Sequence, residues 1–159
     1  MTTEDKELLL RDLCARLPYG IICKCTYPVN NETTDGEDVL FTNDYEIEGI
    51  SRVGAGFAGD RRWYKIRFDG EIYDIDDDGI KVVPYLRPMS SMTKEEILEF
   101  IQIGDSVLRI GERKSTCILS LEQMDWFNKN MFDYRGLIPM GLALEAPEDM
   151  YTDCKSKTH

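Results

Sequence analysis

The stretch GAGFAGDRRWYKIRF, residues 54–68, decides the fold. Its glycines Gly54, Gly56 and Gly59 spell G-x-G-x-x-G, the pattern of a dinucleotide-binding turn. That turn works only when a helix follows it, because the free N–H groups at the helix N-terminus hold the pyrophosphate. Here residues 60–68 alternate with a period of two, which predicts an extended strand. We therefore interpret the glycines as a loop between two strands and not as a nucleotide site.

The strand that follows the glycines has two expected faces, one with Trp63, Lys65 and Arg67 and the other with Tyr64, Ile66 and Phe68. Asp69-Gly70 comes next and is a strong signal for a two-residue hairpin turn. Further strands are expected at residues 21–27, 38–42, 45–53, 71–75 and 80–86, with a turn at Asn43-Asp44 and a polar loop over 30–38. Short strands at hairpin spacing predict a small antiparallel sheet or an SH3-like barrel.

The two ends of the chain have helical patterns. Residues 3–17 are expected to form a helix that Thr2 or Thr3 caps, with an apolar stripe and a stop at Pro18-Tyr19-Gly20. The stripe consists of Leu9, Leu10, Leu13, Cys14 and Leu17. Thr93 and Glu96 form a capping box for a helix over 93–103, with Met92 and Ile97 as its hydrophobic staple.

The rest of the C-terminal part is more varied. Residues 106–119 are expected to form a second hairpin, and Ser120 with Gln123 forms another capping box, which opens a helix carrying Met124, Trp126 and Phe127. Asp133 is expected to start a short turn of helix, and the chain is expected to close as an extended surface tail. The fold class is therefore α+β in a single domain over 1–159, with a helix at 1–19, a β-rich part at 20–88 and a mainly helical part at 89–159.

Charge and composition restrict the function. The net charge is −11, from 30 acidic and 19 basic residues, which disfavours general nucleic-acid binding. An acidic surface that mimics nucleic acid stays open as an alternative. The sequence has no run of 18 apolar residues and no secretory signal, so we expect no membrane span and a cytoplasmic protein.

The cysteines and the clustered acidic residues are the candidate metal ligands, and neither group has the pattern of a metal site. Cys23 and Cys25 share one face of a strand, and we expect them to be buried structural thiols, since the single histidine is His159. Asp74-Ile75-Asp76-Asp77-Asp78-Gly79 resembles the start of a calcium loop. Its twelfth position is Tyr85 where a glutamate is needed, so we expect an acidic turn. The sequence predicts no metal and no cofactor.

Catalytic motifs are missing from the sequence, which contains no G-x-S-x-G elbow, no G-K-[ST] phosphate loop and no H-E-x-x-H. The chain is therefore expected not to be an enzyme. The candidate binding residues are those in and after the glycine loop, where arginine forks and aromatic faces suit a protein partner or a small anionic ligand. They are Phe57, Arg61, Arg62, Trp63 and Tyr64. The alternative is that Phe57 packs on the core and the arginines pair with nearby acids.

Three segments resemble a family of proteins without an assigned activity. They are KELLLRDLCARLPYG (6–20), PYLRPMSSMTKEE (84–96) and DWFNKNMFDYRGLIPMGLALEAPEDMY (125–151). The family recurs in gut bacteria of the Bacteroides group and in their phages and mobile elements. The resemblance implies no catalytic residues. It implies a scaffold made by the shared segments, with the region 21–83 individual to this chain.

The expected function is a non-enzymatic interaction module of phage or mobile-element type that binds a protein through its β-rich part. One alternative is a protein that binds or sequesters a small ligand, such as a nucleotide signal, in conflict between host and phage. Another is an enzyme of unknown type.

Overall fold

The computed structural model describes residues 2–29, 39–53, 63–74, 80–108 and 119–151, with the backbone alone at 29, 39, 52, 53, 63 and 105–108. The chain divides into two compact units, Met1–Tyr85 and Leu86–His159. The expected α+β class with an N-terminal helix is confirmed. The division falls three residues before the expected change from the β-rich to the helical part.

The first unit opens with helix α1, Thr3–Arg16, which Thr2, one of the two expected residues, caps as part of a capping box with Asp5. The Thr2 Oγ1 accepts a hydrogen bond from the Asp5 amide, and an Asp5 carboxylate oxygen accepts one from the Thr2 amide. Leu9, Leu10 and Leu13 are buried as expected. Cys14 is exposed, so its place in the apolar stripe was predicted wrongly.

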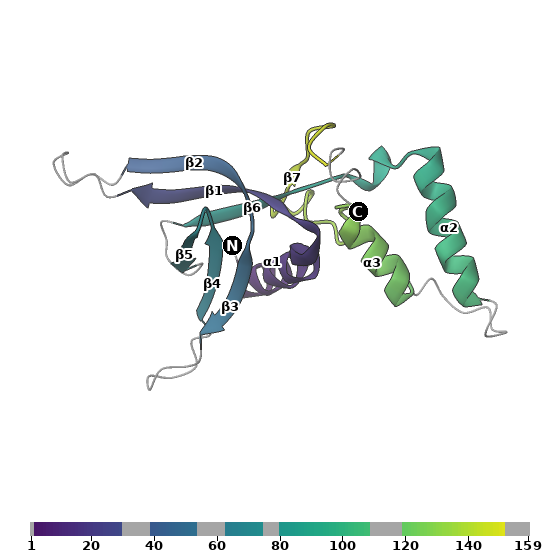
Figure 1. Ribbon diagram of the computed structural model, residues 1–159, viewed down its shortest axis with the longest axis horizontal. Coiled ribbons are helices and arrows are strands. Elements are labelled where there is room, and N and C mark those ends of the chain that lie inside the picture. Colours follow the sequence, from purple (N-terminus) through teal and green to yellow (C-terminus); the bar gives the residue numbers. More distant parts are fainter. Residues whose placement is uncertain (1, 30–38, 54–62, 75–79, 109–118, 152–159) are drawn as a thin grey trace. The chain divides into compact units, whose positions relative to one another are not determined.

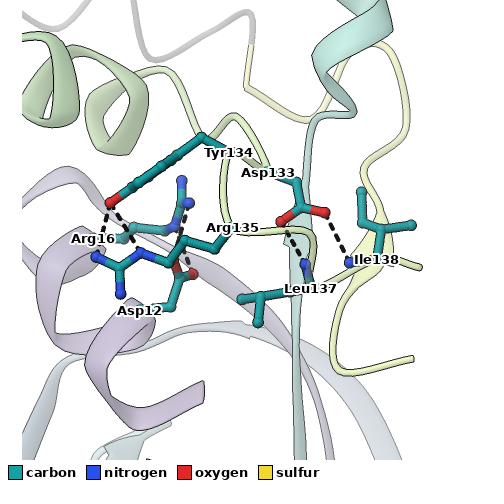
Figure 2. Close-up of polar contacts among 7 residues, drawn as sticks. All are labelled: Asp12, Arg16, Asp133, Tyr134, Arg135, Leu137 and Ile138. Carbon is teal, nitrogen blue, oxygen red and sulfur yellow. Dashed lines mark hydrogen bonds and ion pairs between the residues drawn. The ribbon is translucent and has the colours of Figure 1, made fainter. Parts of the chain in front are cut away.

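Asp12 and Arg16, rather than Cys14, extend the buried face of α1. Their side chains are fully buried, and the carboxylate accepts two hydrogen bonds from the guanidinium, at 2.7 Å from Nε and 3.1 Å from Nη2 (Figure 2). The spacing of four residues places the two side chains on one side of the helix. The short 3₁₀ turn η1, Leu17–Tyr19, then ends at Gly20, whose φ of 72° favours glycine.

Two antiparallel sheets follow in the first unit (Figure 1). In one, β1 (Ile22–Val29) lies between β2 (Val39–Glu46) and β6 (Lys81–Leu86). In the other, β4 (Trp63–Phe68) lies between β3 (Gly49–Val53) and β5 (Glu71–Asp74). The segment that decides the fold is thus extended over the described residues 63–68, with antiparallel neighbours. The preceding glycines lie outside the described residues.

The β4–β5 hairpin confirms two predictions. Asp69 and Gly70 have φ of 53° and 72°, as a tight two-residue turn requires. Ile66 and Phe68 are fully buried, whereas Lys65 and Arg67 are not, so the two faces of β4 are as predicted for these side chains.

The turn predicted at Asn43-Asp44 is wrong, because β2 runs through both residues. Asn43 lies opposite Cys25 and Asp44 opposite Lys24 in an unbroken register with β1. The chain passes between the sheets at residues 47–48 instead. The Ile47 amide donates to the Ile21 carbonyl, and the Glu48 amide donates to the Arg67 carbonyl. The backbone pairing of β2 with β1 overrides the turn propensity of Asn43 and Asp44.

The second unit is organised by Arg87, directly after β6. Its amide donates to the Met131 carbonyl at 2.7 Å, and its carbonyl accepts from the Asp133 amide at 2.8 Å. Its guanidinium makes two hydrogen bonds to the Glu96 carboxylate, at 2.9 and 3.0 Å, and lies 4.2 Å from the ring centre of Phe132. The short strand β7 (Leu144–Glu145) lies next to this segment. Directly after β7, the Ala146 amide donates to the Leu86 carbonyl.

Two helices complete the second unit. After the 3₁₀ turn η2 (Met89–Ser91), helix α2 (Lys94–Leu108) begins at the predicted Thr93–Glu96 capping box, and α3 (Leu121–Lys129) begins at the predicted Ser120–Gln123 box. Phe100 of α2 packs against Trp126 and Phe127 of α3. Because α2 continues to Leu108, the hairpin predicted over 106–119 is wrong at its start, and 109–118 lie outside the described residues.

The segment after α3 also differs from the prediction. Residues 133–141 form turns and not helix. The buried Asp133 carboxylate accepts from the amides of Leu137 and Ile138, at 2.7 and 2.8 Å, and so holds the loop closed (Figure 2). Ala143 is buried and residues 144–145 are a strand, so this end of the chain is tied down more firmly than a surface tail. Among the described residues, no helix has the length and apolar content that crossing a lipid bilayer requires.

The buried pair in α1 gives a stability prediction. We expect Asp12→Ala to lower the free energy of unfolding by about 3–5 kcal/mol, because it leaves the Arg16 charge buried without its carboxylate. Asp12→Leu combined with Arg16→Met removes both charges and is expected to cost much less. Urea unfolding of both variants measures this, with Glu7→Ala on the exposed side of α1 as control. A loss below about 1 kcal/mol for Asp12→Ala would contradict the prediction.

Candidate functional site

The paired ends of β1 and β2 extend beyond the rest of their sheet. β2 pairs with β1 along all eight residues, from Ile22 to Val29, whereas β6 pairs only with Cys23–Thr26. Residues 27–29 of β1 and 39–41 of β2 therefore project as a two-stranded extension, which we name the β1–β2 arm (Figure 1). A ribbon of only two strands is marginally stable in water, so it needs support from side chains.

That support is an aromatic cluster formed by Tyr27, Tyr45, Phe68 and Tyr73. The Tyr27 ring lies 5.6 Å from Phe68 and 5.2 Å from Tyr73, centre to centre, and Phe68 stacks on Tyr73 at 4.3 Å. The Tyr27 and Tyr45 hydroxyls are hydrogen-bonded at 2.9 Å. Since Tyr73 and Phe68 belong to the second sheet, the cluster fixes the base of the arm to both sheets.

Groups beside the cluster are held in their protonated forms. The hydrogen bond to Tyr45, with burial, raises the pKa of Tyr27 to about 12. Burial raises the pKa of Tyr73 as well, and nearby acids add to the effect. Burial, followed by the Asp44 charge, raises the pKa of Cys25 to about 12. Cys23 and Cys25 are fully buried on one face of β1, as predicted for structural thiols, and a protonated thiol is a poor nucleophile and metal ligand.

Two further contacts hold β2 in place. The Thr26 and Thr42 hydroxyls are hydrogen-bonded at 2.9 Å between the paired strands. The Tyr85 hydroxyl donates to the Asp44 carboxylate at 3.0 Å. β2 is thus held through its inner edge and through side chains on its faces.

The outer edge of β2 is unusual for a natural sheet. β2 is the end strand of its sheet, and no strand of the described part of the chain pairs with its outer side. Its residues VLFTNDYE include neither proline nor lysine, the residues that commonly protect such edges. Leu40 and Phe41 are 58% and 44% exposed and project to opposite faces of the arm. The polar groups of the edge and these two apolar side chains together form a surface suited to another strand.

The opposite edge of the arm is protected. Pro28 of β1 lies opposite Leu40 of β2 and beyond the last residue that pairs with β6. Proline lacks an N–H group, so within sheets it occurs where that group would face outward from an edge. Strand addition is therefore disfavoured on the β1 side and open on the β2 side.

The residues predicted from the glycine loop are placed only in part. Phe57, Arg61 and Arg62 lie outside the described residues, and so does the Trp63 side chain. The Trp63 backbone pairs with Val53, and Tyr64, opposite Arg52 in β3, is half-buried. Whether these five residues form one surface stays a prediction.

The acidic turn after β5 offers little that is described. The Asp74 carboxylate lies 3.8 Å from the Lys65 Nζ, and residues 75–79 lie outside the described residues. Within the described part of the chain, no three histidine, cysteine, aspartate or glutamate side chains are grouped to hold a metal ion.

A second apolar surface lies on α2. Ile97, Leu98 and Ile101 are 42%, 60% and 48% exposed, on two adjacent turns of the helix. This α2 face offers side chains alone, because the backbone polar groups inside a helix are already paired. The β2 edge offers backbone groups as well, which makes it the more specific surface.

Sequence reasoning overlooked the β2 edge, although one signal was present. Leu40 and Phe41 are adjacent in a strand, so one of the two must point away from whichever face is buried.

Comparison of the chain with protein families, with curated proteins and with solved structures finds no match. The resemblance to proteins of the Bacteroides group therefore stays a prediction.

The aromatic cluster gives a pH prediction. Tyr27 titrates near 10 when unfolded and at about 12 when folded, so between these values the unfolded chain releases its proton first. The contribution of Tyr27 to the free energy of unfolding is fully present below pH 10 and is lost as the pH rises towards 12. Because Cys25 acts in the same direction from pH 9, the test compares Tyr27→Phe with the wild type. The free energy of unfolding, measured by urea unfolding, should fall less steeply with pH in the variant; equal slopes would contradict the prediction.

Proposed function

We propose that this chain is a non-enzymatic binding module that takes up an extended segment of a partner protein along the outer edge of β2. The observation that carries the proposal is an eight-residue edge strand without proline or lysine. It is paired with β1 on its inner side and has two exposed apolar residues, Leu40 and Phe41. In strand addition the backbone hydrogen bonds provide affinity, and the alternate side chains provide specificity.

The charge of the edge indicates the kind of segment. β2 carries Asp44 and Glu46, both exposed, and no basic residue, and the whole chain has a net charge of −11. A second copy of the chain would bring the same charge and be repelled. The partner is therefore a segment that alternates apolar residues, for Leu40 and Phe41, with lysine or arginine.

The rigid base of the arm supports the same function. The Tyr27–Tyr45 and Thr26–Thr42 hydrogen bonds order β2 before any partner arrives. A preformed edge loses less conformational entropy on binding than a segment that must first fold. We place the module in the cytosol, and the free thiols of Cys14, Cys23 and Cys25 support a reducing compartment.

The test selects, from a displayed library of random peptides, those that bind the full-length protein. We expect the selected peptides to alternate apolar and basic residues and to shift the backbone amide resonances of residues 39–46. Leu40→Lys combined with Phe41→Lys should weaken their binding by at least about tenfold, because it removes the apolar contacts at the centre of the interface.

The matched control adds the same two charges elsewhere. Ile72→Lys on β5 combined with Leu98→Lys on α2 changes two exposed side chains away from the β2 edge. This control should bind the peptides as the wild type does. Loss of binding in the control with retention in the arm variant would assign recognition to the α2 face or to β5, and would overturn the proposal.

A further inference from the structure

The second unit contains a shallow cavity of about 470 Å³ along helix α3, largely open to solvent. It is lined by Leu121, Glu122, Met124, Asp125 and Asn128 of α3 and by Tyr134 and Arg135 of the following turn. Its size is within the range of cavities that bind small molecules. The proposed strand-binding function does not use it.

Asn128 is the clearest sign that the cavity has a ligand. Its side chain lines the cavity and the residue is only 8% exposed, yet its Oδ1 has no hydrogen-bond partner. A buried amide oxygen without a donor costs free energy, so natural proteins seldom leave one unless something else satisfies it. A ligand that carries an N–H donor would satisfy it.

The charges of the cavity agree with a donor ligand. Glu122, Asp125 and Asn128 all line the cavity and are spaced by three residues, so each lies beside the next on the surface of α3. Arg135 brings a positive charge, but its Nε and Nη2 donate to the Tyr134 hydroxyl at 3.0 and 2.8 Å, as Figure 2 shows. The lining therefore contains two acidic side chains and one basic side chain.

The remaining lining is apolar. Leu121, which is 78% exposed, Met124 and the Tyr134 ring provide surface for an aliphatic chain next to the acceptors. The geometry points to a binding site for a small alkyl cation, a primary ammonium or a guanidinium group on an aliphatic stem. The stem contacts Met124 and Tyr134, a cationic N–H group donates to the Asn128 Oδ1, and Glu122 attracts the positive charge. This chemistry is the opposite of the anionic ligand that the arginines after the glycine loop suggest.

The probe for this site is butylammonium, titrated into the full-length protein with methyl-labelled methionines. We expect the Met124 methyl resonance to shift in a saturable way, whereas the methyl groups of Met89 and Met140, outside the cavity lining, stay in place. Butanol, which has no charge, and butyrate, which has the opposite charge, should produce no saturable shift. Equal or tighter binding of either compound would overturn the inference.

Two variants test the assigned roles. Glu122→Gln should weaken butylammonium binding by about tenfold, because it removes a negative charge that attracts the cation. Glu148→Gln makes the same change on an exposed residue that does not line the cavity and should bind as the wild type does. Binding by Glu122→Gln that matches the wild type would reject the site.

Asn128→Leu separates binding from folding. Because leucine has a similar size and no polar group to leave unsatisfied, we expect the ligand-free variant to melt at a higher temperature than the wild type and to bind butylammonium more weakly. A lower melting temperature with unchanged binding would contradict the role of Asn128. Butylguanidinium and a capped peptide with one arginine, titrated in parallel, distinguish a free cation from a side chain of a larger molecule. Saturable binding of either one supports the site.

Discussion

The first unit depends on β1 being paired on both sides. The register with β2 runs over eight residues, and that with β6 over four, so both neighbours of β1 are fixed by one strand. This register directs Cys23, Cys25 and Tyr27 into the core. A slip of one residue would exchange these side chains for Lys24 and Thr26, which the core has no means to satisfy. The positions of β2 and β6 follow from that constraint.

The difference in length between the two pairings creates the arm. Beyond Lys81, where β6 begins, no third strand of the described part of the chain accompanies β1 and β2, and the aromatic cluster gives the support that such a strand would give. Pro28 protects one side of this extension, and nothing comparable in the sequence of β2 protects the other. An exposed edge of this kind favours aggregation unless a partner covers it, so its presence is a cost that binding can explain.

Local signals in the sequence predicted the parts of the fold that local chemistry determines. The helix cap at Thr2 or Thr3, the capping boxes at Thr93 and Ser120 and the Asp69-Gly70 turn depend on residues at most three apart, and all are present, with Thr2 as the cap. The alternation of β4 was equally readable, because one of its faces is buried.

Predictions failed where distant pairing decides the structure. Asn43-Asp44 has the composition of a turn, but β1 holds both residues in a strand. Aspartate is a common first residue of a helix, but the Asp133 carboxylate instead closes a loop by accepting hydrogen bonds from two amides further along the chain. The candidate sites were missed for the same reason. An unpaired edge, or an unsatisfied oxygen such as that of Asn128, is defined by what does not lie beside it, and a single sequence does not contain that information.

The two proposed sites share one electrostatic requirement, although they differ in structure. Both select positive charge, one through the acids of an exposed strand and the other through a lined cavity, and the excess of 30 acidic over 19 basic residues attracts cations to the chain as a whole. Salt screens the attraction between exposed charges. Added salt should therefore weaken the binding of a basic segment at β2 more than the binding of an alkyl cation beside Asn128, since part of the latter binding comes from an uncharged, buried acceptor.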